Sequence, residues 1–168
     1  TQTRKVINMK LYLKLLTFLF TLVGTEVFSQ SSSLSLAGAS HNINLPIEVT
    51  ADSLSVNQSS NTAIFEGSAI VGQGLLRLGA DKITVNYSKT DGEIASIDAI
   101  GNVIFTNGVD IAEAENAFYT INSGLLYMNG NVLLVQGRST ISGDKLDLNI
   151  LTNVATLTGN VKTVLAPK

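Results

Sequence analysis

The sequence contains no cysteine and no tryptophan, one histidine and two prolines. Without cysteine the chain forms neither disulfides nor thiolate metal sites, and thiol catalysis is excluded. The histidine, His41, lies outside the patterned part of the chain, so a serine hydrolase would lack its base. We therefore expect no catalytic residue, no metal site and no cofactor, and we predict that the protein is not an enzyme.

Charged residues are also scarce, at 14% of the chain. Acid pairs such as Asp110 with Glu113 could suggest a glycosidase, and a cluster of acids could bind calcium. Four acids of the patterned region instead recur singly, about 29 residues apart, which favours turn caps and solvent-facing positions.

One long apolar run is present, at residues 15–23. It follows the basic residues Lys10 and Lys14, and a small residue, Ser29, comes shortly after it. This arrangement is typical of a secretory signal peptide, which we place at residues 1–29. A membrane span needs about 20 apolar residues, so a retained membrane anchor is the alternative.

Residues 1–8 precede Met9 and are expected to be an upstream extension. Without residues 1–29 the chain keeps seven basic and 12 acidic residues, a net charge of −5. An acidic domain is poorly suited to nucleic acid, whose phosphates require a basic face. We therefore expect an exported protein that binds no nucleic acid.

Residues 30–45 are rich in serine and are predicted to be a flexible lead-in to a domain at residues 46–168. In that domain a small residue and an acid introduce a short alternating run four times, and a second run built on glycine follows each. The markers are the acids Asp52, Asp81, Glu115 and Asp144 and the glycines Gly67, Gly101, Gly130 and Gly159. Their spacing defines four repeats of about 29 residues, with five extra residues in the second copy around residues 89–96.

Apolar and polar residues alternate with a period of two within the runs. Ile83, Val85 and Tyr87, for example, alternate with polar neighbours. Such alternation indicates strands with one buried face, and the glycine- and asparagine-rich segments between the runs indicate turns. No amphipathic helix is evident after residue 29, so the sequence predicts an all-β protein.

The alternation slips by one residue at each acid. Leu78 and Ala80 share one parity, whereas Ile83 and Val85 share the other. A slip turns the following side chains to the opposite face unless the strand bends. We therefore predict a bulge or corner at each acid, whose side chain accepts hydrogen bonds from freed backbone donors, and a matching corner at each glycine. Such corners let an antiparallel sheet fold over on itself.

Several motifs resemble those of a known family. The corners A-D-K-I and G-D-K-L, the turns G-N-V-I, G-N-V-L and G-N-V-K, and the closing T-V-L-A-P at residues 163–167 are similar to the OstA-like periplasmic lipopolysaccharide-transport proteins, the LptA family. The resemblance covers residues 46–167. It implies a β-jelly roll, an open-ended rolled antiparallel sheet built from the four repeats.

The resemblance also implies a function. Such proteins form a periplasmic bridge that moves lipopolysaccharide through an apolar groove between the inner and outer membranes. The implied partners are lipopolysaccharide, the anchored inner-membrane component, the outer-membrane translocon component and further copies stacked head to tail. Energy comes from an ATPase elsewhere. A structural or adhesive envelope module, and a membrane-anchored component of the same transport system, remain alternatives.

An apolar groove would be lined by the inward-facing residues of the strands. Exposing an acyl chain of about a dozen methylenes to water costs about 10 kcal/mol, at about 0.8 kcal/mol per methylene. The same residues could simply fill a dry core. The predicted lining for lipid A acyl chains is Val49, Leu54, Val56, Phe65, Val71, Leu78, Ile83, Val85, Val103, Phe105, Tyr119, Met128, Val132, Leu134, Leu146 and Leu148.

Head-to-tail stacking would use edge strands, because these offer unpaired backbone donors and acceptors. The expected edges are the strands at residues 47–51 and 160–165, with partner contacts at Ile47, Val49, Val161, Thr163 and Leu165. The alternative is that the serine-rich lead-in or the C-terminal tail covers them.

Overall fold

The computed structural model describes residues 32–35, 42 and 44–165. The predicted signal peptide, most of the lead-in and His41 lie outside the described residues. Within the described part of the chain, no helix is long and apolar enough to cross a membrane. The strands are β1 (Ser32–Ser35), β2 (Ile47–Thr50), β3 (Ser53–Asn57), β4 (Thr62–Gln73), β5 (Leu76–Tyr87), β6 (Ile94–Thr106), β7 (Ile111–Thr120), β8 (Leu125–Gln136), β9 (Ser139–Asn149), β10 (Val154–Thr158) and β11 (Lys162–Val164).

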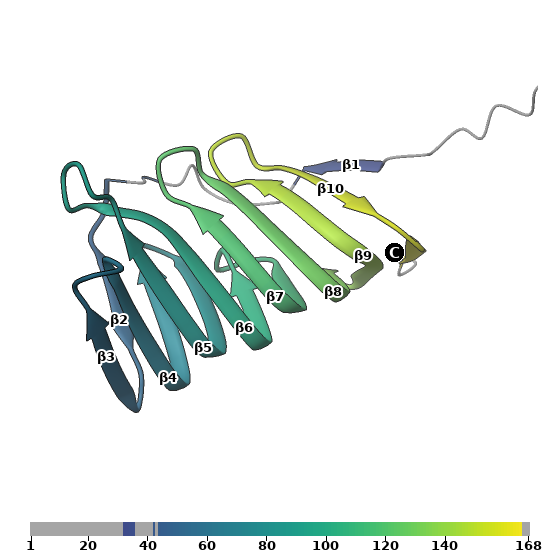
Figure 1. The fold of residues 1–168 in the computed structure, drawn as a ribbon. Coiled ribbons are helices and arrows are strands. Elements are labelled where there is room, and N and C mark those ends of the chain that lie inside the picture. Colours follow the sequence, from purple (N-terminus) through teal and green to yellow (C-terminus); the bar gives the residue numbers. More distant parts are fainter. Residues whose placement is uncertain (1–31, 36–41, 43, 166–168) are drawn as a thin grey trace, which may run out of the picture. The chain divides into compact units, whose positions relative to one another are not determined.

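These strands form one antiparallel sheet. Its order is β1-β10-β9-β8-β7-β6-β5-β4-β2, with β3 also paired to β4 and β11 to β9. Strands β4 to β9 follow one another as hairpins, and Figure 1 shows them side by side. The middle repeats are the hairpins β5–β6 and β7–β8, in which an acid-bearing strand precedes a glycine-bearing strand; in the outer repeats Asp52 lies just before β3 and Gly159 just after β10. The sheet does not close on itself, because β1 and β2 end its order, and the prediction of an open antiparallel all-β fold is confirmed.

A line of bulges crosses the sheet at the repeat markers. Lys82 pairs with Glu66 and Ala80 with Ala69, so Asp81 lies opposite two residues of β4, Gly67 and Ser68. The same register shift recurs between every later pair of long strands. The predicted corners are thus confirmed, with one difference. The extra residue belongs to the glycine strand, and the acid is the single residue opposite it.

This line divides the sheet into two half-sheets. The first consists of β2, β11 and residues 69–73, 76–80, 103–106, 111–114, 132–136 and 139–143. The second consists of β1, β3, β10 and residues 62–66, 82–87, 94–100, 116–120, 125–129 and 145–149.

The inward faces of the two half-sheets share one core. Leu78 and Ala80 of the first half-sheet and Ile83 and Val85 of the second are all buried, as the parity slip predicts. The half-sheets also touch through a polar contact, since the Tyr119 hydroxyl of the second lies 3.4 Å from Gln73 Oε1 of the first. The sheet is therefore folded along the bulge line, which brings its apolar faces together.

The five extra residues of the second repeat lengthen one turn by two residues and extend the strands on either side of it by three. The connection between β5 and β6 covers residues 88–93, whereas the turn between β3 and β4 covers residues 58–61. In the longer turn the Glu93 amide donates to Asp91 Oδ1 at 3.0 Å, and this bond lowers the pKa of the exposed Asp91 carboxyl. The insertion leaves the strand order unchanged.

The lead-in differs from the sequence expectation. Instead of being flexible throughout, it contains β1, which pairs antiparallel with β10 and places Leu34 opposite Ala155. A segment of four residues with three serines is too short and too polar to give a strand signal by itself. The edge of β10 supplies the hydrogen-bonding partner that the local sequence does not reveal.

Candidate functional site

Most of the predicted lining residues lie in the core of the folded sheet. Twelve of the sixteen are buried, and Val49 and Phe65 are partly buried and pack against them. Burial places these residues on the inner faces, and contact with lipid remains a prediction. The buried ones are Val71, Leu78, Ile83, Val85, Val103, Phe105, Tyr119, Met128, Val132, Leu134, Leu146 and Leu148.

The last two residues of the predicted lining, Leu54 and Val56, are exposed. They lie on β3 at one edge of the sheet, and their side chains are 58% and 64% exposed. The equivalent residues of the next repeat, Ile83 and Val85, are 0% and 1% exposed. Leu54 pairs with Phe65, which in turn pairs with Ile83, so all three belong to one inward row. The apolar inner face therefore extends to the β3 edge and is open to solvent there.

The core of the described strands is closely packed, since large side chains such as Ile83, Leu126 and Leu146 are 0% exposed. A cavity of about 20 Å³ lies between the half-sheets, lined by Ile47, Val71, Gln73, Leu76, Leu78, Phe105, Tyr119 and Leu126. Such a volume holds about one water molecule. An acyl chain would therefore enter only if the half-sheets moved apart or neighbouring side chains rotated.

One polar residue, Gln73, lies at this cavity. Its Nε2 donates to the Leu45 carbonyl oxygen at 3.0 Å, and its Oε1 faces the Tyr119 hydroxyl. Burial raises the pKa of Tyr119 to about 12, because the charged phenolate would lose its hydration. Gln73 is not among the lining residues predicted from the sequence. Its parity with Ala69 and Val71 is the signal that could have found it.

The corner acids have structural partners. Asn102 Nδ2 donates to Asp81 Oδ2 at 2.8 Å, and Asn160 Nδ2 donates to Asp144 Oδ2 at 2.9 Å. The third corner repeats the arrangement with Glu115 and Asn131. The sequence predicts backbone donors for these acids, but their partners are the side-chain amides of the asparagines that follow the glycines.

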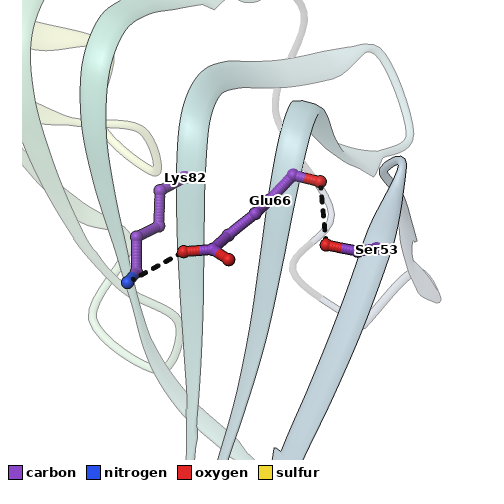
Figure 2. Close-up of polar contacts among 3 residues, drawn as sticks. All are labelled: Ser53, Glu66 and Lys82. Carbon is purple, nitrogen blue, oxygen red and sulfur yellow. Dashed lines mark hydrogen bonds and ion pairs between the residues drawn. The ribbon is translucent and has the colours of Figure 1, made fainter.

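The first corner lacks this asparagine, because Ser68 occupies its position. There the contacts shift to Glu66, as Figure 2 shows. Lys82 Nζ lies 3.1 Å from Glu66 Oε1, and the Ser53 hydroxyl donates to the Glu66 carbonyl oxygen at 3.4 Å. Three neighbouring strands are thus joined beside the bend. Because both charged side chains are substantially exposed, their ion pair contributes little stability.

In the described ranges, no group of three or more histidine, cysteine or acidic side chains is placed to hold a metal ion. The corner acids follow the line of bulges, one to each acid strand, and their partners are amides rather than further carboxylates. Their geometry therefore fits the bending of the sheet.

The predicted partner strands lie at two edges of the first half-sheet. Ile47 and Val49 lie in β2, which pairs with β4. Thr163 lies in β11, which pairs with β9, and the flanking residues Val161 and Leu165 are exposed. In the part of the chain that the structure describes, β2, β3 and β11 each pair with one strand only, whereas β10 lies between β9 and β1.

Comparison with known proteins connects this architecture to a family. Residues 48–154 match the family described as LptA/(LptD N-terminal domain) LPS transport protein. The lipopolysaccharide export system protein LptA of Escherichia coli (strain K12) is 29% identical over 107 residues, which are 60% of this chain and 58% of that protein. The protein of the same name from Haemophilus influenzae is 23% identical over 92% of this chain and 95% of its own.

A solved structure shows the same fold. It is the structure of LptH, described as the LptA homologous periplasmic component of the conserved lipopolysaccharide transport device from Pseudomonas aeruginosa. The TM-score is 0.65 at 16% identity, over 74% of this chain and 98% of that one. This likeness identifies the folded sheet as a β-jelly roll of that type.

Proposed function

Because this chain belongs to the LptA/(LptD N-terminal domain) family of LPS transport proteins, we propose that it carries lipopolysaccharide across the periplasm as part of a bridge between the two membranes. The observation that carries this proposal is one apolar interior that runs through all four repeats and stays open at the β3 edge. The role needs no chemistry on the lipid, which agrees with the expectation that the protein is not an enzyme.

The fold can admit acyl chains without breaking the hydrogen bonds between its strands. Each half-sheet retains its own ladder of strand pairs, and the two are joined along the bulge line. Moving them apart on the other side separates mainly apolar side chains, together with the long contact between Tyr119 and Gln73. An inserted acyl chain would replace those apolar contacts, so its burial, at about 0.8 kcal/mol per methylene, would favour the opened form.

The bridge itself would be built from copies joined end to end. Leu54 and Val56 present apolar side chains beside the free backbone of β3 at one end. A strand from a second copy, or from the anchored or outer-membrane component, would extend the sheet there and continue the apolar interior. The predicted partner contacts of β2 and of residues 161–165 would lie at the same junctions between copies.

The proposal is tested by measuring binding of two ligands to the purified protein. One is intact lipopolysaccharide, and the other is the polysaccharide released from it, which lacks the lipid A acyl chains. We expect binding of the intact molecule only, since the apolar interior recognises acyl chains. A structural or adhesive envelope module would bind neither, and equal binding of both would contradict recognition through the interior.

A further inference from the structure

The two edges of the second half-sheet differ in a way that bears on how copies would join. At the β3 edge the inward residues Leu54 and Val56 are exposed. At the opposite edge the inward residues of β10, Ala155 and Leu157, are fully buried, and β1 lies on the outer side of β10. The edge of β10 is thus already occupied by the chain's own lead-in.

The repeat fixes what a second copy would place against β10. Wherever a glycine strand is followed by an acid strand, the residue two before the glycine pairs with the residue two after the acid. Three pairs follow this rule: Phe65 with Ile83, Ala99 with Ala117, and Met128 with Leu146. Continued past β10, the same register would bring Leu54 of a second copy opposite Leu157, and Val56 opposite Ala155.

β1 takes that place in the structure. It runs antiparallel to β10, as each acid strand runs to the glycine strand before it, and it sets Ser32 opposite Leu157 and Leu34 opposite Ala155. Leu34 thus holds the position of Val56. In this register Ser33-Leu34-Ser35 of β1 takes the positions of Ser55-Val56-Asn57 of β3, again an apolar residue between two polar ones. β1 therefore imitates the first acid strand of another copy.

We propose that the edge of β10 is the acceptor site for β3 of a second copy, and that β1 occupies this site in the isolated chain and must leave before the copies join. The inference rests on the end-to-end joining in the proposed function. It adds a competition that prevents a free chain from extending its sheet prematurely, because an unguarded edge would pair with any available strand.

The length of the lead-in suits a cap that can be displaced. From β1 to β2 the sheet order has eight steps, which at about 4.8 Å each amount to roughly 38 Å. The 12 residue steps from Ser35 to Ile47 reach at most about 40 Å. The chain can therefore supply its own cap with little slack, and this cap covers four of the five residues of β10.

An introduced disulfide can hold β1 on β10. Because the chain has no cysteine of its own, the two introduced cysteines have no other partner within the chain. Ser33 lies opposite Thr156, and Cα atoms of opposite residues are about 4.5–5.5 Å apart, within the range of a disulfide. Oxidised S33C/T156C keeps β1 on β10. The matched control S96C/T120C joins the internal strands β6 and β7 through the same pair of residue types. The variant S33P/L34P removes two backbone donors from β1 and should release it.

Self-association of these variants is measured by analytical ultracentrifugation over a range of concentrations, with circular dichroism as the check on folding. We expect S33P/L34P to associate at a concentration about ten-fold lower than the original chain, the factor for a cap that occupies about 90% of chains, and oxidised S33C/T156C to associate most weakly of all. Reduction should reverse the effect in S33C/T156C, and oxidation should change nothing in S96C/T120C. Equal association of the capped and released variants, or association of neither, would overturn the inference.

Lipopolysaccharide binding by the same variants separates the two proposals. If lipopolysaccharide still binds but the variants associate equally, the cap inference is wrong and the proposed transport function stands. If the variants differ in association as expected but none binds lipopolysaccharide, the cap inference stands and the proposed transport function is wrong.

Discussion

At the scale of single residues, the corner pairs of glycine and its successor determine where the sheet bends. Gly101 has φ +80° and Asn102 has φ +47°, so two successive residues are left-handed, a region that glycine and asparagine tolerate best. The asparagine amide then binds the acid of the neighbouring strand. Each motif G-N thus combines the backbone conformation of the bend with a side chain that secures it.

Replacing Gly101 by alanine should therefore destabilise the fold. A Cβ there would lie 2.5 Å from Asp81 Oδ2, on a backbone that strains any other residue. We expect a loss of about 2 kcal/mol or more in the free energy of unfolding, measured with urea. The control Gly79→Ala lies in the neighbouring strand, where the nearest atom to a Cβ is 3.8 Å away. Equal midpoints for the two variants would contradict this account of the corners.

At the scale of elements, the strands were predictable because they belong to repeats. The change of parity between Leu78 and Ala80 on one side of a corner and Ile83 and Val85 on the other predicts which residues face inward. The burial of all four confirms this prediction. The partner of each corner acid was not predictable in this way, since the choice between backbone and asparagine amide depends on the register between strands. The strand β1 was not predictable either, because it forms only by pairing with the edge of β10.

The open edge makes a prediction at the same scale. Leu54→Lys should weaken self-association, because a charged side chain on the inward row of β3 cannot be buried against a second copy. The folding free energy should change by less than about 0.5 kcal/mol, since Leu54 is already exposed.

The matched control is Leu75→Lys, in the turn between β4 and β5, where the leucine is also exposed. Both variants are compared with the original chain by sedimentation. The edge assignment would be wrong if Leu54→Lys and Leu75→Lys lowered association to the same extent.

At the scale of the whole molecule, the fold could be derived from the sequence, but the state of its interior could not. Four repeats with corners imply a sheet folded on itself, and this is what the structure shows. Whether the inward side chains enclose an open groove or pack together depends on how closely the half-sheets approach. Here they leave about 20 Å³ beside Phe105 and Tyr119, so carriage of lipid requires the interior to open.

The measurement that tests this account most directly is photo-crosslinking of lipopolysaccharide from defined positions. The amino acid p-benzoylphenylalanine replaces Phe105, which is 5% exposed on the inner face, or Phe118, which is 40% exposed on the outer face of β7. Phe65, partly buried on the inner face, is a second inner position that tolerates the larger side chain more easily. Circular dichroism confirms that each variant is folded.

We expect irradiation to attach lipopolysaccharide to the variants at Phe105 and Phe65 and to leave the variant at Phe118 unmodified. Attachment at Phe118 alone, or equal attachment at all three positions, would contradict transport of acyl chains through the interior of the folded sheet.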